Sequence, residues 1–94
     1  MIVERFTIPI KPGKMDEALS MLKDENIFAP FTRRIFSPYI SPRDVVVIDL
    51  DFEDMAEHDQ IWGEVFANKE WDAWLAKWDE IRAGQSSNHL WTLE

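Results

Sequence analysis

The chain has 94 residues, 46% of them hydrophobic and 13% aromatic, so residues 1–94 can build one domain with a substantial core but not two domains. Ten basic residues against eighteen acidic ones give a formal charge of −8, which argues against a grip on nucleic-acid phosphates or on an anionic membrane surface. The lack of cysteine excludes disulfides, thiolate metal sites and a cysteine nucleophile. Because no apolar run is long enough to span a membrane and the N-terminus does not resemble a signal peptide, we expect a cytoplasmic protein.

The N-terminal part of the chain predicts a strand, a helix and a second strand. Residues 1–8 carry β-branched side chains in near-alternation, and two prolines and a glycine within residues 9–13 end this strand. Apolar side chains at helical spacing predict a helix from Met15 to about Glu25. Residues 31–39 predict the second strand.

Pro38 and Pro42 bracket the turn after this second strand, and this placement suits an edge strand because proline cannot donate to a sheet. The next strand, residues 44–52, has the clearest pattern, since alternate side chains point to opposite faces of a sheet. One face is wholly apolar and should be covered by helices, whereas the other is apolar at one end only. The first face carries Val46, Ile48, Leu50 and Phe52, and the second carries Val45, Val47, Asp49 and Asp51.

The C-terminal half predicts two helical segments and a closing strand. Asp54 followed by Glu57 matches a capping box, so a helix should begin there. Asn68 is a candidate N-cap for a second segment, which ends at Gly84. After a polar link, residues 89–93 predict the closing strand.

The order of elements is strand, helix, strand, strand, helix pair, strand. It predicts an α+β fold of the ferredoxin-like βαββαβ type, with a four-stranded antiparallel sheet and helices on one face. The other face would expose an apolar patch, so we expect a homodimer that packs sheet against sheet. This patch would comprise Val45, Val47, Val3 or Ile2, and Trp91 or Leu90.

Several short segments of the chain form a recognisable series: Met1-Ile2 at the start of a strand, Lys11–Lys14 leading into Glu17 and Leu19, Phe52–Glu57, Glu70-Trp71 with Trp74–Lys77, and Ser86–Leu93. Together these segments resemble NIPSNAP-type domains. The resemblance implies the dimeric α+β barrel, a group that also contains cofactor-free monooxygenases, haem-binding and haem-degrading proteins, and lactone isomerases. It implies no catalytic residue, because NIPSNAP-type domains have no agreed catalytic motif.

His58 is the leading candidate for a catalytic or ligand-binding residue, because it interrupts an otherwise apolar helical stripe beside Trp62. An imidazole that points into a cavity between helix and sheet could move protons or bind a ligand. The alternative is a structural histidine that is hydrogen-bonded to Asp54 or to the sheet. His58 and His89 form no local metal motif, so we expect no metal site and no cofactor.

Trp62 and Trp78 belong to aromatic stripes that form either the core or the wall of a pocket for a hydrophobic or planar ligand. Arg5, Arg33 and Arg34 lie on the first two strands, and Arg34 must point to the opposite face from Arg33. One arginine could pair with Asp49 across the sheet or across the dimer, or hold a ligand carboxylate. The candidate ligand-binding residues are therefore His58, Trp62, Trp78 and Arg34.

These observations favour a homodimeric NIPSNAP-like protein that binds a small hydrophobic or aromatic ligand between sheet and helices. Three alternatives stay open: a cofactor-independent monooxygenase or isomerase on an aromatic or enolisable substrate with His58 as base, a haem-binding protein, and a non-catalytic interaction module. The interaction module would have no internal cavity. The sequence has neither a glycine-rich phosphate loop nor a nucleophile elbow, which argues against nucleotide-dependent enzymes and hydrolases.

Overall fold

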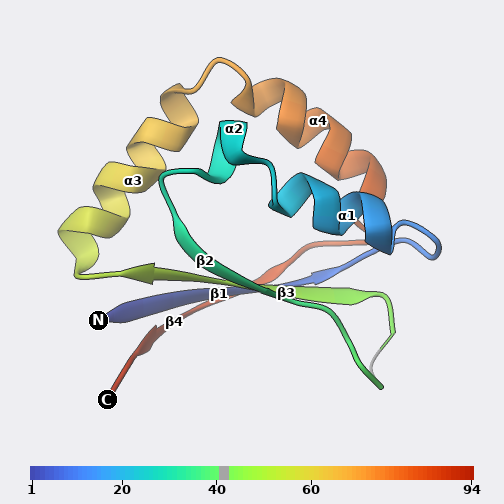
Figure 1. Ribbon diagram of the computed structural model, residues 1–94, viewed down its shortest axis with the longest axis horizontal. Helices are drawn as coiled ribbons and strands as arrows, with labels where there is room; N and C mark the ends of the chain where they lie inside the picture. The colour runs from blue at the N-terminus through green and yellow to red at the C-terminus, as the bar shows by residue number, and fades with distance from the viewer. Residues whose placement is uncertain (41–42) are drawn as a thin grey trace.

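A four-stranded antiparallel sheet with helices on one side is the framework of the computed structural model, which describes residues 1–40 and 43–94 (Figure 1). The predicted turn residue Pro42 lies outside these residues. No helix of the described residues is long and apolar enough to cross a membrane. The elements in chain order are β1 (Ile2–Pro9), α1 (Met15–Leu22), α2 (Glu25–Phe28), β2 (Thr32–Phe36), β3 (Val45–Phe52), α3 (Met55–Ala67), α4 (Trp71–Ile81) and β4 (Ser87–Thr92).

The strand order β2–β3–β1–β4 is that of the predicted ferredoxin-like fold. All neighbouring strands are antiparallel, and β2 lies at an edge as predicted, although it is shorter than the expected residues 31–39. Figure 1 shows the helices together on one side of the sheet and none on the other. The fold therefore has one covered face and one open face.

The first helical segment is shorter than predicted. α1 ends at Leu22 and a separate turn, α2, begins after Asp24, so the expected single helix to about Glu25 is wrong. The Asp24 side chain accepts a 2.9 Å hydrogen bond from the backbone N–H of Asn26. This cap favours the start of a second helical turn at Glu25 over continuation of α1. The Phe28 side chain at the end of α2 is buried in the core.

The predicted cap at Asp54 is confirmed, whereas the N-cap position of α4 is Glu70 and not the predicted Asn68, which ends α3. The Asp54 carboxylate accepts a 2.9 Å hydrogen bond from the N–H of Glu57 at the start of α3. The Asn68 side chain accepts one of 2.9 Å from the N–H of Glu70 in the turn before α4. Each of these bonds satisfies a backbone donor that the helix itself leaves unpaired.

The C-terminal boundaries differ from the prediction. α4 ends at Ile81 rather than at Gly84, because the N–H of Ala83 bonds to the carbonyl of Pro9 at 2.8 Å instead of continuing the helix. β4 runs from Ser87 to Thr92, so both of its ends lie slightly earlier in the chain than those of the predicted strand, residues 89–93. Its register is fixed by pairing with β1. Helix propensity thus yields to tertiary pairing at this end of α4.

The core lies between the helices and the covered face of the sheet. The predicted division of β3 is confirmed, since its four helix-facing apolar residues are each at most 3% exposed. Ala18, Val65 and Trp78 pack on them from three different helices. β4 is the exception, because all of its residues are exposed. No helix therefore covers β4 on the helix-bearing side of the sheet, and the candidate site lies there.

Candidate functional site

A cavity of about 590 Å³, the large cavity, opens where α3 passes over the β1–β4 edge of the sheet. α3 supplies most of its wall, β1 and β4 supply its floor, and the first residue of α4 completes it. Its lining residues are Glu4, Phe6, His58, Asp59, Trp62, Gly63, Phe66, Trp71 and Asn88. The wall is thus largely aromatic, and the acidic and imidazole groups are side chains of β1 and α3.

Glu4 is the buried charge of this site. It lies on the helix-facing side of β1, between Ile2 and Phe6 in the same alternation, and is only 4% exposed. The indole Nε1 of Trp62 donates a 2.7 Å hydrogen bond to Glu4 Oε1. The second oxygen, Oε2, accepts no hydrogen bond from the residues that the structure describes. Oε2 is also absent from the fully buried unpaired atoms of the described residues, so it is open to the large cavity and is a candidate ligand contact.

His58 lies between two carboxylates. Its Nδ1 is 2.9 Å from Asp59 Oδ1, in hydrogen-bond geometry. Its Nε2 is 3.2 Å from Glu4 Oε1, but the two atoms are not aligned as a hydrogen bond, and this buried nitrogen has no other partner within the described chain. The ring also packs edge-on against Phe52, with centroids 4.9 Å apart.

The charge state of His58 depends on these neighbours. Burial lowers the pKa of His58, but the hydrogen bond to Asp59 and the negative charge of Glu4 outweigh burial, so the pKa lies above its ordinary value of 6.5. The predicted partner Asp54 is instead engaged in the α3 cap. The alternative of a hydrogen bond from the His58 ring to Asp54 is therefore wrong. The ring does lie against the sheet at Glu4, but without a hydrogen bond to it.

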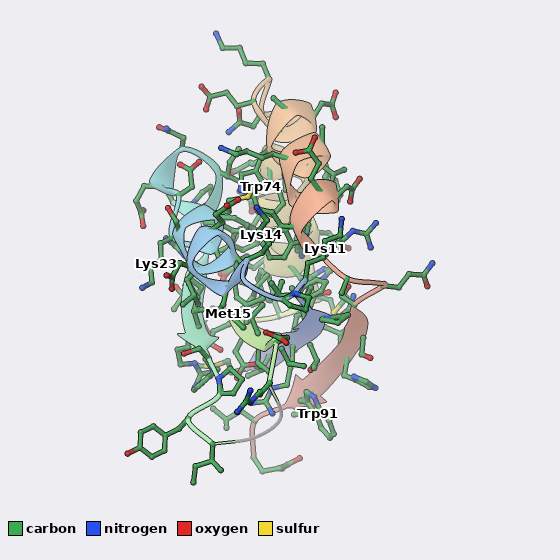
Figure 2. All side chains as sticks on the ribbon, turned by 90° about the vertical axis from the view of Figure 1, so that its right-hand side faces the viewer. Lys11, Lys14, Met15, Lys23, Trp74 and Trp91 are labelled. Atoms are coloured by element: carbon green, nitrogen blue, oxygen red, sulfur yellow. The ribbon has the colours of Figure 1, made fainter. Side chains whose placement is uncertain are left out.

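The aromatic side chains form a continuous wall along α3 and α4. Trp62 stacks on Phe66 with centroids 5.4 Å apart, and Trp71 stands edge-on to Trp62 at 6.3 Å. Beyond Trp71, the ring of Trp74 follows at 5.3 Å. Figure 2 shows Trp74 between α4 and the α1–α2 segment, where its Nε1 donates to the Met21 carbonyl at 3.1 Å.

Trp78 lines a different cavity. It is 6% exposed, stacks on Trp74 with centroids 5.2 Å apart, and lines a smaller cavity of about 130 Å³ under α4. This smaller cavity shares Phe6, Trp62 and Trp71 with the large cavity. Trp78 is therefore a core residue behind the aromatic wall and does not line the large cavity.

Arg34 lies on the open face of the sheet, away from His58. Its Nη2 donates a 2.7 Å hydrogen bond to Asp51 and lies 3.8 Å from Asp49. Arg33 points to the covered face, as the alternation predicts, and donates to the Phe28 carbonyl at 2.9 Å. The structure thus brings His58 and Trp62 together in the large cavity but places Arg34 on the other side of the sheet.

The open face has its own charged centre. Arg5 holds Asp49 with two hydrogen bonds of 2.7 and 2.8 Å, and Asp49 is only 2% exposed. The hydrogen bond from Arg5 lowers the pKa of Asp49 below its ordinary value of 3.8, against the opposing effect of burial. Trp91, which Figure 2 shows beside β4, lies on this face next to Val3.

Glu4, Phe66 and Trp71 were not among the predicted site residues. Glu4 carries a readable signal, because it is the single charged side chain in the alternation of Ile2, Glu4, Phe6 and Ile8 that otherwise supplies an apolar strand face. The positions of Phe66 and Trp71 follow from how α3 and α4 meet, which no local pattern encodes. Within residues 1–40 and 43–94, no three histidine, aspartate or glutamate side chains are grouped as a metal ion would require.

The sheet order, the helices on one face and the cavity beside β4 define a ferredoxin-like α+β domain. Neither a protein-family model nor a curated protein matches the amino-acid sequence. Solved structures do match. An uncharacterised NIPSNAP domain protein from Burkholderia xenovorans has a TM-score of 0.86 at 19% identity, over 100% of this chain and 95% of that one.

Two further structures have the same architecture. A NIPSNAP family protein from Agrobacterium tumefaciens has a TM-score of 0.81 at 20% identity, over 97% of this chain and 90% of that one. An antibiotic biosynthesis monooxygenase has a TM-score of 0.72 at 16% identity, over 100% and 99% of the two chains. The protein therefore has the fold of the NIPSNAP domain proteins, which confirms the fold that the sequence segments suggested.

Proposed function

We propose that this protein binds a small hydrophobic or aromatic ligand in the large cavity. The observation that carries the proposal is the aromatic wall of Phe6, Trp62, Phe66 and Trp71 beside the buried carboxylate of Glu4. Ligand sites are typically concave, mostly apolar and equipped with a few polar groups that orient the ligand. A cavity of about 590 Å³ lies within the size range of such sites.

Gly63 offers a direct test, because it lines the large cavity and an added Cβ would meet no atom within 4 Å. Gly63→Leu would place a bulky side chain at the cavity wall and improve the helix propensity of α3. Ala76→Leu adds a leucine at an exposed position of α4 and is the matched control. The probe is N-phenylnaphthylamine, a neutral aromatic dye whose fluorescence rises in an apolar site.

The proposal predicts saturable dye binding by the wild type and by Ala76→Leu. Binding by Gly63→Leu should be weaker by about tenfold or more, since its side chain occupies the space of the ligand, and its thermal midpoint should be no lower than that of the wild type. Dye binding that is equal in all three proteins would show that the large cavity is not the site.

We also propose that the protein is a homodimer that packs through the open face. Phe36, Trp91 and Leu93 on or beside this face are 45%, 57% and 59% exposed, which is unfavourable for a monomer in water. The bonded Arg5–Asp49 pair at its centre would bury two already neutralised charges, so that a second copy would not desolvate a free ion.

Proton transfer at the Glu4–His58 contact is the second candidate function. Asp59 engages Nδ1 of His58, while Nε2 lies 3.2 Å from the Glu4 carboxylate, so a proton could pass between a bound ligand and this pair. Such a site would suit the predicted cofactor-independent oxygenase or isomerase on an aromatic or enolisable substrate. The test is oxygen uptake with a panel of polyphenols. A rate that is the same in wild type and His58→Gln would remove His58 from the reaction.

The other two alternatives are a haem-binding role and a pure interaction module. A haem-binding role would need a free imidazole nitrogen, yet Nδ1 bonds to Asp59 and Nε2 is buried against Glu4. Addition of hemin should therefore give no band that is lost in His58→Ala. A pure interaction module predicted no internal cavity, and the cavity beside His58 opens to the surface, so this alternative stays a prediction.

A further inference from the structure

The charged groups that line the large cavity are of one predominant sign. They are the carboxylates of Glu4 and Asp59 and the imidazole of His58, and the lining contains no lysine or arginine among the described residues. Two carboxylates outnumber one imidazole, so these groups sum to a negative charge whether or not His58 is protonated. The whole chain carries −8, so the surrounding field also attracts cations.

Glu4 is the carboxylate that a ligand in the large cavity could contact directly. Its side chain is 6% exposed, and one oxygen accepts the N–H of Trp62 at 2.7 Å. Its other oxygen accepts no hydrogen bond from the described residues, although Glu4 lines the large cavity. This oxygen is not fully buried, so a charged N–H donor on a ligand in the cavity could pair with it, whereas a ligand anion would be repelled by it.

The aromatic residues beside Glu4 form a corner that suits a positive group. Trp62 and Phe66 stack at an interplanar angle of 29°, and Trp71 stands across them at 78° to Trp62 and 65° to Phe66. Aromatic faces attract ammonium groups as well as flat hydrocarbon bodies. The corner therefore has contact surface for both halves of an amphipathic cation.

We propose that the ligand of the large cavity is an amphipathic organic cation, a protonated amine whose ammonium group lies at Glu4 and whose apolar body lies on Trp62, Phe66 and Trp71. This inference rests on the proposed ligand-binding function and narrows its ligand class. It assigns Glu4 the role of the charge-selective residue and the aromatic wall the role of the shape-selective surface.

The test compares three ligands of similar shape and different charge: naphthylmethylammonium, naphthylmethanol and naphthylacetate. Their affinities for the wild-type protein are measured by calorimetry near neutral pH, with N-phenylnaphthylamine as the neutral reference for an intact site. The amine should bind tighter than the alcohol by about tenfold, and the carboxylate should bind weakest. Equal affinities, or tighter binding of the carboxylate, would overturn the assignment to cations. If the dye still bound, the proposed ligand-binding function would stand.

Glu4→Gln locates the source of the preference. Glutamine keeps an oxygen that can accept from Trp62 but removes the charge. The variant should lose most of the preference for amine over alcohol, whereas Glu64→Gln, at an exposed position of α3 outside the cavity lining, should keep it. An amine preference that survives in a folded Glu4→Gln protein would refute the role of Glu4. Failure of the wild type to bind any of the four compounds would overturn both the cation assignment and the proposed function.

Discussion

The indole Nε1 of Trp62 donates a 2.7 Å hydrogen bond to the buried carboxylate of Glu4, and this bond joins α3 to β1 across 58 residues of chain. The same carboxylate oxygen lies 3.2 Å from Nε2 of His58. One strand residue thus fixes the positions of two residues of α3, which lie one helical turn apart. The site is held by the same contacts that hold the helix on the sheet.

Trp62→Phe should lower the free energy of unfolding by about 1–3 kcal/mol, because it keeps an aromatic ring but removes the only N–H donor that the described residues offer to the Glu4 carboxylate. Trp71→Phe is the matched control, since the indole of Trp71 belongs to the same aromatic wall and donates to no described residue. Urea unfolding followed by circular dichroism measures both. Equal losses for the two variants would mean that the bond to Glu4 adds nothing beyond packing.

The raised pKa of His58 predicts a pH-dependent stability. Its folded-state pKa lies above the unfolded value of 6.5, so protonation favours the folded state. The stabilisation from His58 is fully present below the unfolded pKa and is lost as the pH rises through the folded pKa. The difference in unfolding free energy between wild type and His58→Gln should therefore shrink as the pH rises from below 6.5 through the raised folded pKa. An NMR titration midpoint for His58 at or below 6.5 would contradict this reading.

Arg5 and Arg34 should contribute unequally to stability, although both lie near Asp49. Arg5 makes two hydrogen bonds of 2.7 and 2.8 Å to this buried carboxylate, whereas Arg34 is 3.8 Å away and its side chain is 53% exposed. Arg5→Met should cost about 1–2 kcal/mol, a value reduced for the partial exposure of Arg5, and Arg34→Met about 0–1 kcal/mol. Urea unfolding at neutral pH checks the order, and a larger loss for Arg34→Met would reverse it.

The lowered pKa of Asp49 predicts that the stabilisation from the Arg5–Asp49 pair depends on pH. The stabilisation from Asp49 is present above its unfolded pKa of 3.8 and is lost as the pH falls through the lower folded value. The stability difference between wild type and Arg5→Met should therefore decrease in acid. A difference that stays constant down to the acid unfolding transition would show that the Arg5 side chain acts through packing instead of charge.

The proposed homodimer predicts that one charge on the open face dissociates it. Val47→Glu places a carboxylate among Thr7, Phe36 and other residues of the open face, where a partner sheet would have to desolvate it. Sedimentation velocity should show a dimer for the wild type and a monomer for the variant. Ala73→Glu, which adds the same charge to the exposed side of α4, should stay dimeric. A monomeric wild type at micromolar concentration would exclude the dimer.

Local patterns in the sequence determined most of the fold. The strict alternation of residues 44–52 identified which face of β3 is buried, because side chains of a strand point alternately to opposite faces. The cap at Asp54 placed the start of α3, because its side chain accepts from a backbone donor three residues on. Asn68 did not do the same for α4, whose N-cap is Glu70. Where the prediction was wrong, as at Gly84, a distant strand competed with the local signal: the N–H of Ala83 bonds to Pro9.

The candidate site was only partly predictable. His58 and Trp62 stood out because they share a helical stripe, and they do line the same cavity. Arg34 could not be placed, since a shift of one residue in strand register exchanges the two faces of a sheet. Trp78 had the same spacing as the cavity residues and became core, because α4 lies over the sheet where Trp78 meets Ile8 and Leu50 at the smaller cavity.

The sequence by itself determined the order of the strands and main helical segments, the cap of α3 and the apolar face of β3, because these depend on neighbours a few positions apart. Only the tertiary structure decided that Glu4 meets Trp62 and His58, and that β4 is left uncovered. Those outcomes depend on the register of β1 in the sheet and on the position and orientation of α3 above it. Both are set by the packing of the whole core, which is a sum over many distant contacts and has no local signature.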